Sequence, residues 1–210
     1  MGTIDTASVL MKRSAQSALL FGLACLLAAC AHAPRLGEAA DALSAEEHLR
    51  LGASYEAQGM RADAVRQYEE AVSRSTSCAE GWLALGNIAF TDGRLTAAED
   101  CYRKALQASP QHPGAANNLA MVYLEQNGSL TEAEALAQSA LLNAGALRPY
   151  VLDTLANIYL RQKRYEEAST ALDRAEEAAP ADNAAVHAQL LKTRALINTA
   201  RPLATPAQQI

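Results

Sequence analysis

The chain has 210 residues, of which 50% are hydrophobic and 5% aromatic, and its formal net charge is −5. A chain this acidic binds the phosphates of nucleic acids poorly, so we expect no nucleic-acid partner. Alanine and leucine supply most of the apolar side chains and enter helices at little cost, so the composition favours helices over strands. We therefore predict an all-α protein.

The N-terminal segment has the organisation of an export signal. A short basic stretch precedes an uncharged, apolar run over residues 18–29. Twelve helical residues rise about 18 Å, which is well short of the ~30 Å hydrocarbon core of a bilayer. We therefore predict a cleaved signal peptide over residues 1–29, for which either Met1 or Met11 fits as the start.

The apolar run ends in Leu27-Ala28-Ala29-Cys30, which resembles the bacterial lipobox, leucine-small-small-cysteine. The resemblance implies that the Cys30 thiol receives a diacylglyceryl group, that a peptidase cuts before it, and that the new amino terminus is acylated. Such a protein is anchored in the bacterial cell envelope. By resemblance to enterobacterial lipoproteins, Ala31 favours the outer membrane, facing the periplasm. An ordinary secretory signal with a chance cysteine is the alternative.

The segment after the lipobox has no sustained apolar face. Residues 30–43 contain proline, glycine and many alanines, so we predict a tether between the lipid and a folded domain. Ser44 and Glu47 then have the spacing of a capping box, in which each side chain bonds the backbone N–H of the other residue. We expect the folded domain to begin there and to cover residues 44–200.

From residue 44 onward, a pattern of small and large residues recurs four times at spacings of 34 to 36 residues. Each unit has a leucine followed by glycine or alanine, and then two further alanines. Four copies in one register indicate tandem structural repeats. The recurring positions are Leu51-Gly52, Leu85-Gly86, Leu119-Ala120 and Leu155-Ala156, then Ala64, Ala98, Ala133 and Ala168, then Ala71, Ala105, Ala140 and Ala175.

This pattern resembles the tetratricopeptide repeat, a pair of helices that cannot bury its apolar stripe alone and therefore stacks into a solenoid. The small residues let the two helices of a unit approach closely. A large residue fills the remaining gap in three units, whereas Ala137 stands at that place in the third. The resemblance places repeats at about 45–78, 79–112, 113–147 and 149–182, a capping helix at 183–199 and a mobile tail at 201–210.

Two further motifs predict where second helices begin. Thr96-x-x-Glu99 and Thr131-x-x-Glu134 have capping-box spacing in the second and third repeats. We therefore expect Thr96 and Thr131 to be the residues that cap these two helices.

In the tetratricopeptide family the first helix of each repeat lines a concave groove, and the resemblance assigns the positions that face it. Apolar residues there are costly to leave in water, and asparagine amides can both donate to and accept from a peptide backbone. We predict a groove for a protein or peptide partner, with Phe90 and Met121 in one pocket; an ordinary solenoid surface is the alternative. Five acidic groove residues against Arg161 disfavour recognition of a C-terminal carboxylate. The predicted groove residues are Leu83, Asn87, Phe90, Asn117, Met121, Leu124, Tyr150, Asn157 and Leu160.

The sequence contains no motif typical of catalysis, phosphate binding or zinc binding. We therefore predict no enzymatic activity, no cofactor and no metal site. His48 occupies a core-facing repeat position, where a packing role is expected. Cys78 and Cys101 are expected to be small buried apolar residues, with a disulfide between them as the alternative.

These features together predict a membrane-anchored scaffold or adaptor that binds a protein partner and aids assembly or positioning of a larger envelope complex. Lipobox, tether and repeats are similar to the type IV pilus pilot lipoproteins, which suggests pilus or secretion machinery. The alternatives are an adaptor for peptidoglycan-modifying enzymes, an undetected enzyme, or a self-associating structural protein. The sequence leaves the oligomeric state open.

Overall fold

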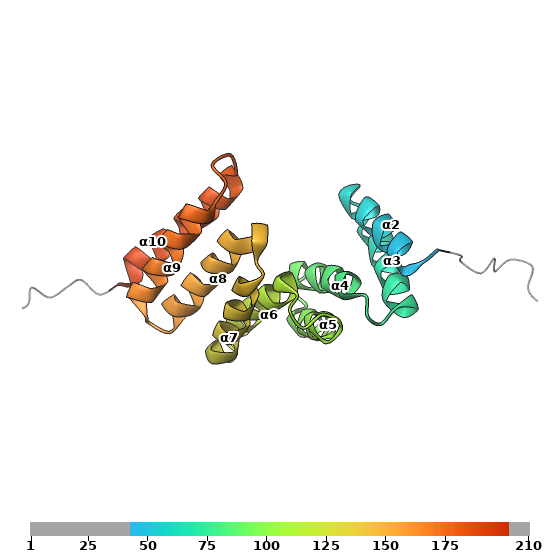
Figure 1. Cartoon of the computed structure of the whole chain (residues 1–210), viewed down its shortest axis with the longest axis horizontal. Helices are drawn as coiled ribbons and strands as arrows, with labels where there is room; N and C mark the ends of the chain where they lie inside the picture. The colour runs from blue at the N-terminus through green and yellow to red at the C-terminus, as the bar shows by residue number, and fades with distance from the viewer. Residues whose placement is uncertain (1–42, 202–210) are drawn as a thin grey trace, which may run out of the picture. The chain divides into compact units, whose positions relative to one another are not determined.

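A computed structural model describes residues 43–201, which form helices joined by short connections and contain no β-strand (Figure 1). The all-α prediction is thereby confirmed for this range. The predicted signal peptide, Cys30 and nearly all of the tether lie outside the described residues, as does the tail after residue 201. The helices are α2 (Ala45–Ala57), α3 (Arg61–Arg74), α4 (Ala79–Thr91), α5 (Leu95–Ala108), α6 (Pro113–Glu125), α7 (Leu130–Leu142), the 3-10 turn η1 (Gly145–Leu147), α8 (Arg148–Arg161), α9 (Tyr165–Ala178) and α10 (Ala184–Ala200).

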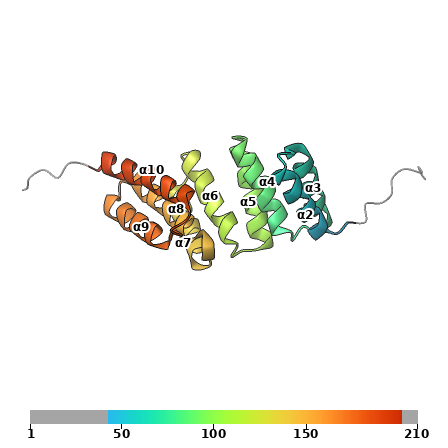
Figure 2. The same cartoon turned by 90° about the horizontal axis from the view of Figure 1, so that it is seen from above.

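The α-helices before α10 pack in consecutive pairs: α2 with α3, α4 with α5, α6 with α7, and α8 with α9. The second helix of each pair also contacts the first helix of the next pair. Figures 1 and 2 show the pairs following one another in chain order. This is the predicted arrangement of a tetratricopeptide solenoid, in which each repeat contacts its neighbours.

Helix α10 lies where the sequence predicts a capping helix. It packs against both α8 and α9, and its side chains Val186, Leu190 and Ile197 are almost completely buried. The last pair is therefore covered on this side by apolar side chains from α10. Among residues 43–201, no helix is long and apolar enough to cross a membrane.

The recurring small residues lie where neighbouring helices touch. Each of the four repeats has two recurring alanines in its second helix, and the exposed fractions of these eight side chains are 0–1%. A methyl group at each of these positions fills the contact between two backbones, and any larger side chain would separate them. This burial explains why alanine recurs at these positions through all four repeats.

In repeats one and two, the glycine that follows the recurring leucine lies against the ring of a tyrosine in the second helix of the same repeat. A Cβ atom at Gly86 would lie 2.5 Å from Tyr102 Cε1, and one at Gly52 would lie 2.6 Å from Tyr68 Cε1. Both tyrosine rings are buried, so neither can move away cheaply. Glycine is therefore required in repeats one and two by the ring that occupies the space beside it.

Repeats three and four have alanine at the same close-approach position. Their first helices carry Ala120 and Ala156, and the residues that correspond to the tyrosines are Ala137 and Leu172. All four are completely buried. Without a tyrosine ring in this place, the first helix can carry a methyl group.

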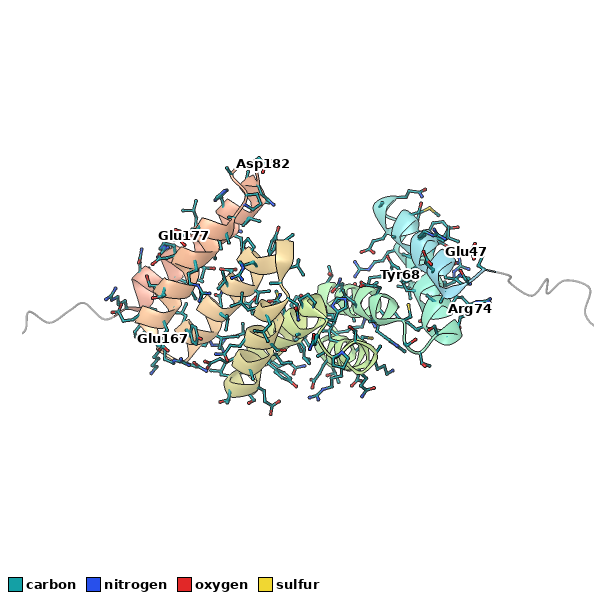
Figure 3. All side chains as sticks on the ribbon, viewed as in Figure 1. Glu47, Tyr68, Arg74, Glu167, Glu177 and Asp182 are labelled. Atoms are coloured by element: carbon teal, nitrogen blue, oxygen red, sulfur yellow. The ribbon has the colours of Figure 1, made fainter. Side chains whose placement is uncertain are left out.

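Of the three helix caps predicted from the sequence, one is confirmed and two are wrong. Ser44 caps α2 with a full capping box: Glu47 N donates to Ser44 Oγ at 3.3 Å, and Ser44 N donates to Glu47 Oε2 at 2.7 Å (Glu47 is labelled in Figure 3). The predicted capping role of Thr96 is wrong, because α5 begins at Leu95 after Arg94, which makes no side-chain cap. Gly93 has a positive φ of 72°, which ends the turn after α4. Helix α5 therefore begins two residues before the position that a cap at Thr96 would give it.

The capping role of Thr131 is also wrong. Helix α7 begins at Leu130, and the residue before it, Ser129, accepts a hydrogen bond from Glu132 N at 3.2 Å. Serine caps helices at least as well as threonine, and Ser129 stands two residues before Thr131, so the helix begins after Ser129.

Candidate functional site

Three cavities follow one another along the first helices of the repeats, and we call them together the first-helix groove. The N-terminal cavity, about 470 Å³, lies between α2 and α4; the middle cavity, about 170 Å³, between α4 and α6; and the C-terminal cavity, about 420 Å³, between α6, α8 and α10. Asn87 lines both the N-terminal and middle cavities, and Met121 lines both the middle and C-terminal cavities. Neighbouring cavities of the groove are therefore no more than one side chain apart.

Most of the predicted groove residues line these cavities. Phe90 and Met121, which come from neighbouring repeats, face the same middle cavity, as the sequence predicts. The apolar members are half-buried, so part of each side chain is open to a bound partner. The predicted residues found in the groove are Leu83, Asn87, Phe90, Met121, Leu124, Asn157 and Leu160.

Two predicted groove residues are placed elsewhere. Asn117 is only 6% exposed and lines none of the three cavities; its amide nitrogen donates to Asn118 Oδ1 at 3.3 Å. Tyr150 is 42% exposed near the start of α8 but also lines none of them. Asn118, the neighbour of Asn117, lines the middle cavity instead.

Two tyrosines of the second helices reach into the groove, and the sequence analysis did not identify them. Tyr102 OH donates to Asn87 Oδ1 at 3.0 Å in the middle cavity, and Tyr68 OH donates to Glu56 Oε2 at 2.8 Å in the N-terminal cavity. Tyr68 is labelled in Figure 3. Burial raises the pKa of Tyr102 to about 12, so its hydroxyl keeps the proton that it donates. The signal was available, because tyrosine stands where the repeat pattern has phenylalanine.

The asparagines of the groove also hold it together. Asn87 Oδ1 accepts a second hydrogen bond from Asn118 Nδ2 at 2.8 Å, which joins α4 to α6. Asn157 Nδ2 donates to the backbone oxygen of Asp153 at 2.8 Å and to Thr193 Oγ1 at 3.4 Å, which joins α8 to α10. These amides fix the walls of the groove as well as presenting polar atoms to it.

The groove carries an excess of negative charge. Two of its residues are basic: Arg50 pairs with Glu46 at 3.8 Å, and Arg161 bonds the backbone oxygen of Leu124 at 3.4 Å and the side chain of Asn127. The structure thus adds Arg50 to the Arg161 that the sequence identified. The surplus of carboxylates favours a basic partner over an acidic one. The acidic residues that line the groove are Glu46, Glu56, Glu80, Glu125 and Asp153.

A separate cavity of about 540 Å³ lies against the second helices α5 and α7. Its walls include Leu106 and Leu136, and Arg103 lies at its edge with Glu99 at 2.9 Å. It shares no residue with the first-helix groove. The two surfaces can therefore be changed independently by substitution.

The remaining candidate residues have structural roles. His48 is fully buried, as the sequence predicts, and its Nδ1 lies 2.8 Å from Gln67 Oε1. Cys78 and Cys101 are both free and half-buried, so the alternative of a disulfide between them is not found. In the described part of the chain, no three histidine, cysteine, aspartate or glutamate side chains are grouped as a metal would need.

Known proteins resemble the chain in both sequence and fold. A curated relative, the photosystem I assembly protein Ycf3 of Cyanophora paradoxa, is 32% identical over 102 residues, which are 44% of this chain and 59% of the relative. The match thus spans about three fifths of the length of that relative. A crystal structure of MamA has 22% identity and a TM-score of 0.58, and covers 67% of this chain and 81% of MamA.

The PilF protein of Pseudomonas aeruginosa has 18% identity and a TM-score of 0.59, and the match covers 76% of this chain and 74% of that one. At these identities, MamA and PilF show a common fold. Family models described as tetratricopeptide repeat match residues 49–113, 89–151 and 149–182. These matches run without a break over more than half of the chain, and the helix pairs agree with them, so the chain belongs to the tetratricopeptide-repeat family.

Proposed function

We propose that this protein is a membrane-anchored scaffold whose first-helix groove binds a segment of a protein partner in the bacterial envelope and so aids assembly or positioning of a larger complex. The observation that carries the proposal is the row of three cavities along the first helices, in which neighbouring cavities share Asn87 or Met121 as a lining residue. Such a row suits a peptide that contacts several repeats at once.

The chemistry of the groove supports a peptide as its occupant. Leu83, Phe90 and Leu160 offer apolar surface for side chains, one in each cavity. Asn118 lines the middle cavity and has an amide that suits a peptide backbone. Pockets of this kind bind through a few apolar anchors, with polar groups that set orientation.

The anchor is part of the same proposal. The lipobox ending at Cys30 would fix the chain to a membrane, with Ala31 directing it to the outer membrane, and the tether would let the repeats reach a partner in the periplasm. The assembly role is supported by the name of the relative Ycf3, an assembly protein. The pilus or secretion context rests on the similarity of lipobox, tether and repeats to the type IV pilus pilot lipoproteins.

Phe90→Ala is expected to weaken partner binding about tenfold, because Phe90 forms a wall of the middle cavity and is the largest apolar side chain there. The partner is first recovered by pull-down from envelope extract with the full chain, and its affinity is then measured by calorimetry. Leu142→Ala is the matched control, because Leu142 is 83% exposed and lines none of the cavities described above. If Arg103→Glu beside the second helices abolishes binding while Phe90→Ala leaves it intact, the groove is the wrong surface.

A further inference from the structure

The C-terminal cavity contains a carboxylate whose hydrogen bonding is incomplete. Asp153 lines this cavity and is only 8% exposed. Its Oδ2 accepts from Gln189 Nε2 at 3.3 Å, while its Oδ1 is buried and has no hydrogen-bond partner within residues 43–201. Burial raises the pKa of Asp153, against the hydrogen bonds from Thr193 and Gln189 that lower it. A buried carboxylate oxygen left in this way is costly unless a donor completes it.

Other polar side chains near Asp153 do not donate to its carboxylate. Thr154 Oγ1 donates to the backbone oxygen of Tyr150 at 3.0 Å, and Asn157 donates to the backbone of Asp153 and to Thr193. Arg161 lines the same cavity, but its guanidinium bonds Asn127 and the backbone of Leu124. The one basic side chain of this cavity is therefore directed away from Asp153.

The walls of this cavity suit a long side chain with an apolar stem. Leu124, Leu160 and Leu196 line it together with Met121, which also lines the middle cavity. Lysine and arginine bury their aliphatic stems along such walls and place the charged group at the end. The excess of carboxylates along the groove adds attraction for a cation.

We infer that the C-terminal cavity receives a lysine or arginine side chain of the bound peptide, whose charged group pairs with the carboxylate of Asp153. This inference rests on the proposed function of the groove as a peptide-binding site. It adds the chemistry of one residue that the peptide must carry, and it makes Asp153 the residue that selects it.

The experiment selects peptides from a random displayed library on the immobilised full chain in detergent. Wild-type protein is compared with Asp153→Asn, which keeps the size of the side chain and an oxygen that can accept from Gln189. Glu125→Gln is the matched control, because Glu125 lines the same cavity, is exposed, and loses the same charge. Thermal unfolding of the three proteins checks that each is folded.

We expect wild-type selections to fix lysine or arginine at one position, and Asp153→Asn selections to lose that preference while keeping the apolar positions of the motif. For a selected lysine peptide, changing lysine to norleucine should lower affinity about tenfold on wild type and on Glu125→Gln, and less than twofold on Asp153→Asn. An equal loss on all three proteins would show general electrostatics and would overturn the inference.

The outcomes also separate this inference from the proposed function. If the selected peptides lack a basic residue but their binding depends on Phe90, the groove remains the binding site and the role of Asp153 is refuted. If no peptide is enriched on wild-type protein, both the groove proposal and this inference fail.

Discussion

Cys30→Ala is expected to abolish incorporation of a fatty-acid analogue and to move the protein from the membrane fraction to the soluble fraction. The thiol of Cys30 is the nucleophile to which the diacylglyceryl group would be attached. Each buried CH₂ of an acyl chain contributes about 0.8 kcal/mol to membrane binding, so the loss of all chains removes the anchor as a whole. The measurements are metabolic labelling with a clickable palmitate and fractionation of the envelope.

Cys25→Ala supplies the matched control, since it makes the same chemical change five residues earlier in the apolar run. It should leave labelling and fractionation unchanged. The lipobox assignment is refuted if Cys30→Ala is still labelled, or if Cys25→Ala loses the label to the same extent.

Gly86→Ala is expected to lower the free energy of unfolding by about 2 kcal/mol. The new Cβ would lie 2.5 Å from Cε1 of the buried Tyr102 ring, and overpacking of this kind costs up to about 3 kcal/mol. Alanine offsets about 1 kcal/mol of this through its higher helix propensity. A melting temperature lower by roughly 4–8 °C in thermal unfolding of the full chain would be the measured effect.

The same substitution should change sign when the ring is removed. In a Tyr102→Leu background the pair resembles Ala156 and Leu172 of repeat four, so Gly86→Ala should stabilise by about 1 kcal/mol. Tyr102→Leu by itself loses the hydrogen bond to Asn87 and serves as the reference for that comparison. An equal destabilisation in both backgrounds would show that the ring is not the cause.

The sequence determined the fold through its period. Four copies of a pattern in one register place each small residue where two helices touch, and this requirement is local to a repeat, so it can be read without coordinates. Burial of Ala64, Ala98, Ala133 and Ala168 follows directly from it. The helical period of 3.6 residues likewise determines which face of its helix carries Leu83, Phe90 or Met121.

Contacts between helices decided what the period could not. Asn117 and Asn118 are adjacent in the sequence, yet Asn117 is buried while Asn118 lines the middle cavity and bonds Asn87 of α4. The hydroxyls of Tyr68 and Tyr102 reach the groove because of the space left by a glycine on another helix. Each of these outcomes depends on how closely two helices pack, which the spacing of the pattern does not specify.

The C-terminal cavity shows the same division most clearly. Asp153 is one of the five acidic residues that the resemblance assigns to the groove, and α10, which packs against α8, adds Gln189 and Thr193 as hydrogen-bond partners. The side chain is left 8% exposed at the wall of the cavity, with Oδ1 buried and without a hydrogen-bond partner among the described residues, so the cost of its burial is only partly offset. The sequence determined which residue stands there, and the tertiary contact with α10 decided its environment.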